Sequence, residues 1–154
     1  MFSVARESVL DKYAPFLQAS STTCGYLFAV VSGESLSETA RAAFSSSAEA
    51  LGYGKAGCFF ITLNGQRSLE PKEAFELIEG IDPLVMVVAD KAAANVLSLA
   101  YRTAEGPRVI EPLKVQAILG RDSVVFDSFE GMLGTAAAKQ RAWALLKKLP
   151  HLGS

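Results

Sequence analysis

The chain has 154 residues, of which 50% are hydrophobic and 20% are charged, and 15 basic residues against 16 acidic ones give a formal net charge of −1. This length and composition predict one globular domain with a core of its own over residues 1–154, and they exclude a disordered chain. The balanced charge gives no global electrostatic reason for tight binding to nucleic acid, and leaves a local basic surface open.

The N-terminal segment 1–20 is predicted to be an amphipathic helix, which Pro15 kinks or ends. Residues 20–25 are polar and are predicted to be a linker. Segments dominated by apolar residues follow at 26–31, 57–63 and 82–90. Each of these runs is typical of a strand that is buried on both faces.

In the intervals between these runs, apolar residues recur at helical spacing, which predicts helices there. The first intervening helix is expected to begin after Ser35 as part of a capping box and to end at Gly52. The second begins near Pro71 and ends at Gly80, and Asp90 is expected to cap the third. All three connections are short, which favours strands and helices in strict alternation.

Residues 102–112 show no clear helical or strand pattern, and they lead into the C-terminal part of the chain. Residues 113–126 predict either a hairpin or a pair of strands around Gly120. The last helix is predicted to bury Ala138, Ala142, Leu145 and Leu149. The resulting order predicts the α/β class: a three-layer α/β/α sandwich around a central, mainly parallel four-stranded sheet.

Cysteine and histidine are scarce. Cys24 and Cys58 lie beside or within apolar runs, which favours two reduced, buried thiols over a disulfide or a metal site. The only histidine, His151, lies in residues 151–154, which we expect to be a flexible tail. Histidine-based catalysis and most zinc chemistry are therefore excluded, and we expect no metal and no cofactor.

No apolar run is long enough for a membrane span, and the first residues alternate charged and apolar side chains too evenly for a signal peptide. We therefore expect a cytoplasmic protein with no membrane contact.

Ligands of such folds bind at the carboxyl ends of the strands, so four turns carry the functional interest: 32–35, 64–68, 89–91 and 127–131. None of them contains a phosphate-binding loop, a dinucleotide fingerprint or a nucleophile elbow. The sequence thus gives no support for nucleotide binding of those kinds or for serine-hydrolase chemistry.

The polar residues of these turns are the candidates for ligand binding, and each also has a structural interpretation. Glu34, the one catalytic candidate, has a carboxylate that can position a water, or that merely favours the positive end of the next helix. The Asn64 amide can read a nucleobase, or it can belong to a common Asn-Gly turn. Asp127 and Ser128 can contact a ligand or cap the turn before the last helix. The full set is Ser32, Gly33, Glu34, Asn64, Asp127 and Ser128.

The last helix carries Lys139, Arg141, Lys147 and Lys148, with no acidic residue from Gly134 onward. A positive stripe beside a cleft would suit phosphates. Lysines near a helix C-terminus also interact favourably with the helix dipole, which accounts for two of the four without any nucleic acid.

From residue 26 to residue 149 the order of motifs resembles the uracil-DNA glycosylase superfamily, most closely its small bacterial members. "VVSGES" offers Gly33-Glu34 where that family has a Gly-Glu catalytic turn, and "FFITLN" offers Asn64 where the family contacts the flipped uracil. "IDPLVMVVADKAAANVL" is similar to the family's third strand and Ala-rich helix start. "VVFDSFEGMLGTAAAKQRAWALLKKL" is similar to its last strand, leucine and helix, with Trp143 late in that helix.

The sequence also departs from the family pattern at the positions that carry its chemistry. The His-Pro loop, whose histidine stabilises the charge that develops on uracil, is replaced by Ser128-Phe129, and Asp90 stands where the family usually has glycine. The Pro-Gly of the first turn and the iron–sulfur cysteines of some subfamilies are absent. Phe44 is either a remnant of the aromatic that stacks on uracil or a core residue.

Three hypotheses follow, in order of preference. The first is a glycosylase-like domain that has lost base excision and acts as a binding or interaction module, so that it is not an enzyme. The second is an active, divergent DNA glycosylase that binds DNA or a nucleobase-like ligand through Glu34 and Asn64. The third is an unrelated α/β domain, whose strand order would differ from the order 2-1-3-4 that the resemblance implies. The protein partner is left open.

Overall fold

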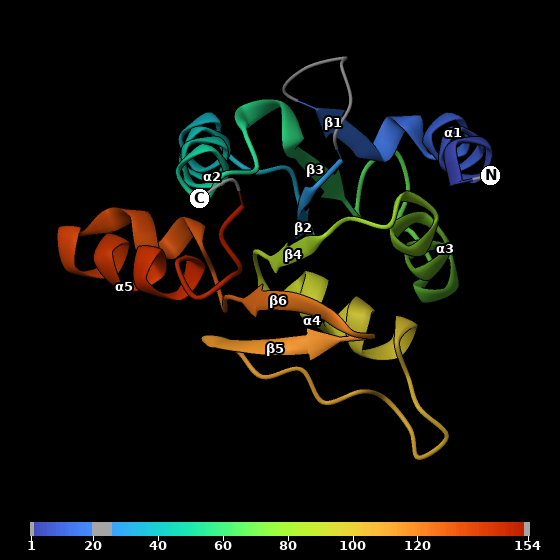
Figure 1. The fold of residues 1–154 in the computed structure, drawn as a ribbon. Coiled ribbons are helices and arrows are strands. Elements are labelled where there is room, and N and C mark those ends of the chain that lie inside the picture. Colours follow the sequence, from blue (N-terminus) through green and yellow to red (C-terminus); the bar gives the residue numbers. More distant parts are fainter. Residues whose placement is uncertain (1, 20–25, 153–154) are drawn as a thin grey trace.

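The computed structural model describes residues 2–19 and 26–152. The helices are α1 (Phe2–Lys12), α2 (Glu38–Ala50), α3 (Pro71–Ile81), α4 (Lys91–Ala100) and α5 (Ala136–Leu146), with 3₁₀ turns η1 (Ala14–Phe16), η2 (Lys55–Gly57) and η3 (Glu130–Gly134). The strands are β1 (Leu17–Ala19), β2 (Phe28–Ser32), β3 (Cys58–Thr62), β4 (Val85–Val88), β5 (Lys114–Ile118) and β6 (Arg121–Val125). Figure 1 shows them in one α/β arrangement.

The strands form one mixed sheet in the order β1-β3-β2-β4-β6-β5. The four inner strands are parallel to their inner neighbours, whereas β1 and β5 pair antiparallel at the two edges. The predicted count of four strands is therefore wrong, because the sheet has six. The inner order β3-β2-β4-β6 matches the predicted order 2-1-3-4.

The two edge strands lack the apolar run that marks the inner strands, although β5 lies within residues 113–126, for which the sequence predicts a hairpin or a pair of strands. β1 has only three residues, and β5 is partly exposed along most of its length. Of the two alternatives for residues 113–126, the hairpin is correct, and its turn is made by Leu119 and Gly120 with φ of 52° and 78°. A turn with positive φ at both central residues has the twist that joins antiparallel strands.

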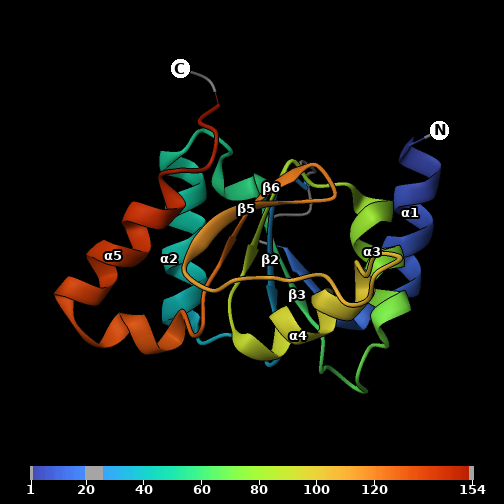
Figure 2. The same cartoon turned by 90° about the horizontal axis from the view of Figure 1, so that it is seen from below.

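The sheet is covered by helices on both faces, as Figure 2 shows, with α2 and α5 on one side and α1 and α3 on the other. Alternate residues of β2 supply the two cores: Phe28 and Val30 pack with α2 and α5, while Ala29 and Val31 pack with α1, α3 and α4. This alternation is the two-residue period of a strand, so both faces must be apolar. The three-layer architecture predicted from the sequence is confirmed.

The N-terminal segment differs from the prediction of a helix over 1–20. α1 ends at Lys12, η1 with Pro15 follows, and Leu17–Ala19 pairs with β3 as strand β1. The predicted linker 20–25 lies outside the described residues, as does Cys24. Cys58 is buried, and burial raises the pKa of its thiol to about 12.

The helix termini largely follow their predicted signals. Asp90 caps α4, and α3 begins at Pro71. The cap of α2 is Ser37 rather than Ser35, since its side chain accepts the backbone N–H of Ala40. In the segment predicted to be a flexible tail, Leu152 donates its backbone N–H to the carbonyl of Leu51 at 2.8 Å.

Candidate functional site

Backbone hydrogen bonds join the turns at the carboxyl ends of the parallel strands. Leu63 and Asn64 donate their backbone N–H groups to the carbonyls of Ser32 and Gly33, each at 2.9 Å. On the other side, Lys91 donates to the carbonyl of Asp127 at 3.0 Å. The convergence of the candidate turns on one edge of the sheet, as predicted, therefore has a direct structural basis.

Glu34 and Asn64 are brought together at this edge. The Asn64 side-chain Nδ2 lies 3.4 Å from Oε1 of Glu34, and Glu34 is exposed while Asn64 is half-buried. The hydroxyl of Ser32, which is buried, donates to the carbonyl of Glu34 at 2.7 Å. The Ser32 hydroxyl therefore holds the turn in shape, and Glu34 is the group that faces solvent.

Asp90 occupies the centre of the turn cluster. Its two carboxylate oxygens accept the backbone N–H of Gly33 at 3.0 and 3.1 Å, and Oδ1 also accepts the N–H of Ala93 at 2.8 Å. The sequence predicts the capping bond to α4 but not the bond to Gly33, which lies 57 residues away in the chain. One carboxylate thus accepts hydrogen bonds from the backbone of both the first turn and the N-terminus of α4.

Gly33 is required by the close approach of β2 and α4. A Cβ atom at this position would lie 2.7 Å from Cβ of Ala92 and 3.3 Å from Oδ1 of Asp90. The glycine therefore serves packing at a place where no space for a side chain exists.

Asp127 and Ser128, the fourth candidate turn, have different roles. The Ser128 hydroxyl accepts the backbone N–H of Gly131 at 3.0 Å, so the capping interpretation holds for this residue. Both side chains are exposed, and Asp127 lines a pocket. Ser128 therefore caps the turn, whereas Asp127 is the candidate for contact with a ligand.

Glu130 is a site residue that sequence reasoning missed. Its carboxylate accepts the backbone N–H of Ser37 at 2.6 Å and the Ser37 hydroxyl at 2.7 Å, which ties η3 to the start of α2. The partners are 93 residues apart, and no local pattern indicates their contact.

A pocket of about 260 Å³ opens beside the turn cluster, between α4, the end of β6 and the 110–112 segment. Lys91, Asn95 and Asp127 give it polar groups, while Ile110 and Phe126 are among its apolar walls. Within the described residues, no hydrogen bond or ion pair is formed by the side chains of Lys91, Asn95 or Asp127. Apolar walls combined with a few polar groups are common in small-molecule sites.

Lys91 and Asn95 were also missed from the sequence, although a signal exists. Residues four apart lie on the same side of a helix, and α4 follows a parallel strand whose carboxyl end is at the candidate edge. The spacing of a lysine and an asparagine in the first turns of α4 therefore points to this pocket.

The edge as a whole is acidic. Glu34, Asp90, Asp127 and Glu130 place carboxylates around it, and Lys91 is the cation that lines its pocket. Carboxylates repel a polyanion such as DNA. Among the described residues, no group of three or more histidine, cysteine, aspartate or glutamate side chains is arranged to hold a metal ion.

Phe44 belongs to the core rather than to the edge. It is fully buried and stacks on Phe129, with ring centroids 3.9 Å apart and 27° between the planes. Of the two interpretations offered for Phe44, the core residue is the correct one, and its ring is not available to stack on a base.

The fold and the site define an α/β domain with a polar turn cluster and a small pocket at the carboxyl edge of its sheet. A scan against protein-family models finds no family that matches the chain, and a search of curated proteins finds none that is similar. Over residues 2–19 and 26–152, the helices are too short or too polar to span a membrane.

Proposed function

We propose that this chain is a uracil-DNA glycosylase-like domain that has lost base excision and serves as a binding module at the carboxyl edge of its sheet. The inner strand order β3-β2-β4-β6, together with the positions of Gly33-Glu34 and Asn64 at the ends of β2 and β3, supports the likeness of the scaffold.

The observation that carries the proposal is the position of the Asp90 carboxylate. Backbone N–H groups in a turn and at a helix N-terminus are suited to bind an anion or a carbonyl oxygen. Here the N–H groups of Gly33 and Ala93 are both taken by Asp90. A ligand would have to displace an internal, charge-assisted bond, which favours loss of the older site.

The residues that stand where the family has its histidine, Ser128 and Phe129, support the same conclusion. The hydroxyl of Ser128 is engaged with Gly131, and Phe129 is buried in the core. The one histidine, His151, lies beyond α5 and contacts the carbonyl of Lys147 at 3.0 Å. No group of this kind is therefore available at the edge to stabilise charge on a departing base.

The retained binding function is assigned to the pocket of Lys91, Asn95 and Asp127. A lysine donor, an amide that both donates and accepts, and a carboxylate acceptor together match the polar edge of a nucleobase-like ligand. The apolar wall would take the face of its ring.

An active, divergent glycosylase is the second candidate, and one observation favours it. The 3.4 Å separation of Glu34 and Asn64 would allow one carboxylate to position a water beside an amide that holds the base. An unrelated α/β domain is the third candidate, and the inner strand order does not separate it from the first, because the common flavodoxin-like order 2-1-3-4-5 contains the same run.

Single-turnover release of uracil from single-stranded and mismatched duplex DNA at low salt tests the proposal, with the Glu34→Ala protein as control. We expect no release from either protein. Release that Glu34→Ala abolishes would establish the second candidate instead.

Binding is tested separately by saturation-transfer NMR with uracil and uridine as probes. We expect transfer to the probes from the unmodified protein and its loss in Asp127→Ala, whereas Lys72→Ala, which alters an exposed lysine on α3, leaves it unchanged. Equal transfer in all three proteins would contradict the assignment of the pocket.

A further inference from the structure

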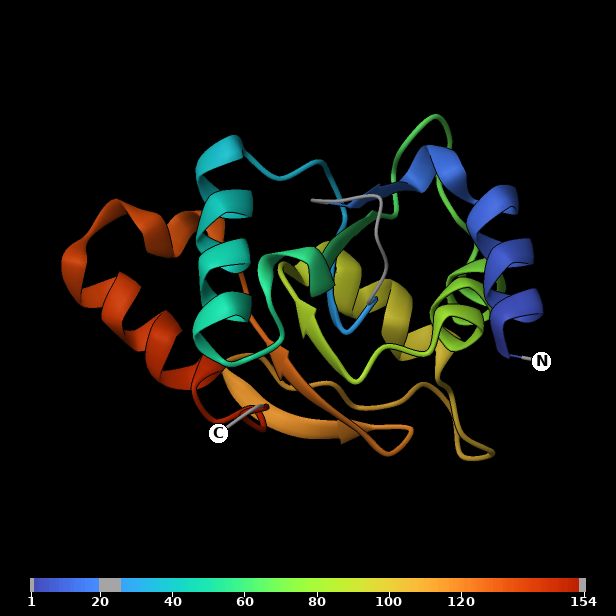
Figure 3. The same cartoon turned by 45° about the horizontal axis from the view of Figure 1, so that its top comes forward.

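A second hollow lies away from the sheet edge, between two helices that cover the same face. The α2–α5 groove has a volume of about 270 Å³ and is lined by Thr39, Ala43 and Ser47 of α2, by Lys139 and Trp143 of α5, and by Leu133 of η3. Figures 1 and 3 show α2 and α5 side by side over the sheet. The groove is separate from the pocket of Lys91, Asn95 and Asp127, and the inference drawn from it does not depend on the proposed function.

The α2 wall of the groove is made of small side chains without charge. Thr39, Ala43 and Ser47 recur every four residues, so they form one row along the helix. The Ser47 hydroxyl already donates to the carbonyl of Ala43 at 2.8 Å, so its proton is engaged within the helix. The row spans about 12 Å, or two helical turns.

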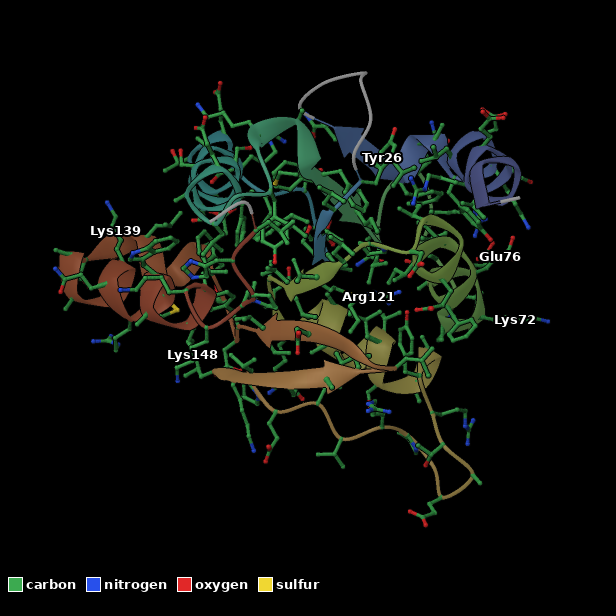
Figure 4. The ribbon with its side chains drawn as sticks, in the orientation of Figure 1. Tyr26, Lys72, Glu76, Arg121, Lys139 and Lys148 are labelled. Carbon is green, nitrogen blue, oxygen red and sulfur yellow. The ribbon has the colours of Figure 1, made fainter. Side chains whose placement is uncertain are left out.

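The α5 wall is apolar in its middle and positive at both ends. Lys139 lines the groove, and Nζ of Lys147 lies 5.9 Å from the ring centroid of Trp143, which also lines it. Lys139 and Lys147 are eight residues apart, so they flank Trp143 about 12 Å from each other along α5. Figure 4 shows Lys139 and Lys148 on opposite sides of α5, so Lys148 does not share this edge.

Among the described residues, no ion pair involves the cations of the last helix, Lys139, Arg141, Lys147 and Lys148. No acidic residue follows Gly134 in the sequence. An apolar groove edged by unpaired lysines is complementary to an apolar surface that is edged by carboxylates.

We infer that the α2–α5 groove is a docking site for an acidic amphipathic helix of a partner protein. A helix that lays apolar residues into the groove at spacings of four and three would cover Leu133 and Trp143 over two turns. Aspartate or glutamate residues two turns apart on its flank would meet Lys139 and Lys147. The small side chains of Thr39, Ala43 and Ser47 let its backbone approach α2 closely.

Fluorescence anisotropy with a designed peptide tests the inference. The probe is a labelled helical peptide of about four turns, with leucines at the required spacing and glutamates on both flanks. Two matched probes carry lysines in place of the glutamates, or the same composition in scrambled order. We expect the acidic helix to bind about tenfold more tightly than either of the others at low salt.

Variants of the protein assign the binding to the groove. Lys139→Glu with Lys147→Glu should weaken binding of the acidic peptide by about tenfold, whereas Arg141→Glu with Lys148→Glu, which changes the net charge equally on the same helix, should change it less than about twofold. Ala43→Gln fills the α2 wall without a charge and should abolish binding. Circular dichroism and thermal unfolding establish that each variant is folded.

Other outcomes overturn the inference. Equal binding of the three peptides, or equal effects of the two double substitutions, would exclude an acidic helix as the occupant. Concentration-dependent dimerisation in light scattering that Lys139→Glu with Lys147→Glu abolishes would assign the groove to a second copy of the chain. Displacement of the peptide by duplex DNA would assign the α5 cations to phosphates.

Discussion

Gly33 lies where the end of β2 meets the start of α4, and it leaves no room for a side chain. Gly33→Ala would set a methyl group 2.7 Å from Cβ of Ala92, an atom that moves only with the backbone. We expect a loss of about 1–3 kcal/mol in the free energy of unfolding, measured by urea denaturation. Gly134→Ala is the control, because nothing lies within 4 Å of a Cβ there, and an equal loss in both variants would refute the steric explanation.

The pKa of Glu73 is lowered by the hydrogen bonds that its carboxylate accepts. The guanidinium of Arg67 donates two hydrogen bonds of 2.7 Å to its carboxylate, and the backbone N–H of Glu70 donates a third at 3.0 Å. Together they lower the pKa of Glu73 from 4.5 to about 2.

A lowered pKa in the folded state means that this contribution to stability is present above about pH 4.5 and is lost as the pH falls toward 2. We expect an NMR titration to give a pKa near 2 for Glu73 and a return toward 4.5 in Arg67→Ala. Arg41→Ala, which removes an arginine that contacts Gln18, should leave the titration unchanged. A normal pKa in the unmodified protein would contradict the pairing.

At the scale of elements, Arg121, which is the first residue of β6, connects this strand to the end of α3. Its guanidinium donates to Glu79 and Asp82 at 2.8 Å each and to the carbonyl of Pro83, also at 2.8 Å, and Figure 4 shows it between the two elements. Tyr101, at the end of α4, donates its hydroxyl to the same Glu79 at 2.6 Å. One buried arginine thus holds α3, α4 and β6 together at the amino end of the sheet.

Removal of this arginine should lower the free energy of unfolding more than removal of a residue from an exposed ion pair. We expect Arg121→Ala to lower the free energy of unfolding by about 2–3 kcal/mol, toward the lower end for a broken buried pair because the Asp82 side chain is 61% exposed. Lys114→Ala breaks an exposed pair with Glu111 and should cost less than about 1 kcal/mol. Urea denaturation of both variants measures the difference, and losses of equal size would contradict the network.

At the scale of the whole molecule, the charge of the carboxyl edge bears on whether DNA can bind there. The formal net charge is −1, and the edge carries the carboxylates of Glu34, Asp90, Asp127 and Glu130. A protein that neutralises phosphates with lysine and arginine binds DNA in a strongly salt-dependent way.

We therefore expect no retardation of single-stranded or duplex DNA in native gels, even at low salt. Glu34→Lys combined with Asp127→Lys supplies the comparison, since it reverses the charge at the edge and should introduce salt-dependent retardation. Retardation by the unmodified protein that weakens as salt is added would contradict the proposed loss of the DNA role.

The sequence by itself determined the features that depend on neighbouring residues. Apolar runs located three of the inner strands, the predicted pair of strands around Gly120 located the fourth, and helical spacing with caps such as Asp90 located the helices between them. The alternation of these elements sufficed for the α/β class, and thereby for the edge on which Glu34 and Asn64 meet, whereas the inner strand order was expected only from the family resemblance.

Only the tertiary structure decided the features that join distant segments. β1 is too short to signal a strand, and it becomes one because an edge of the sheet offers it hydrogen bonds. β5 lies within residues 113–126, for which the sequence predicts a strand, and only its place at the other edge of the sheet comes from the fold. The bonds from Asp90 to Gly33 and from Glu130 to Ser37 span 57 and 93 residues, so no local pattern encodes them. The α2–α5 groove likewise exists only because two separate helices pack on one face of the sheet without closing the space between them.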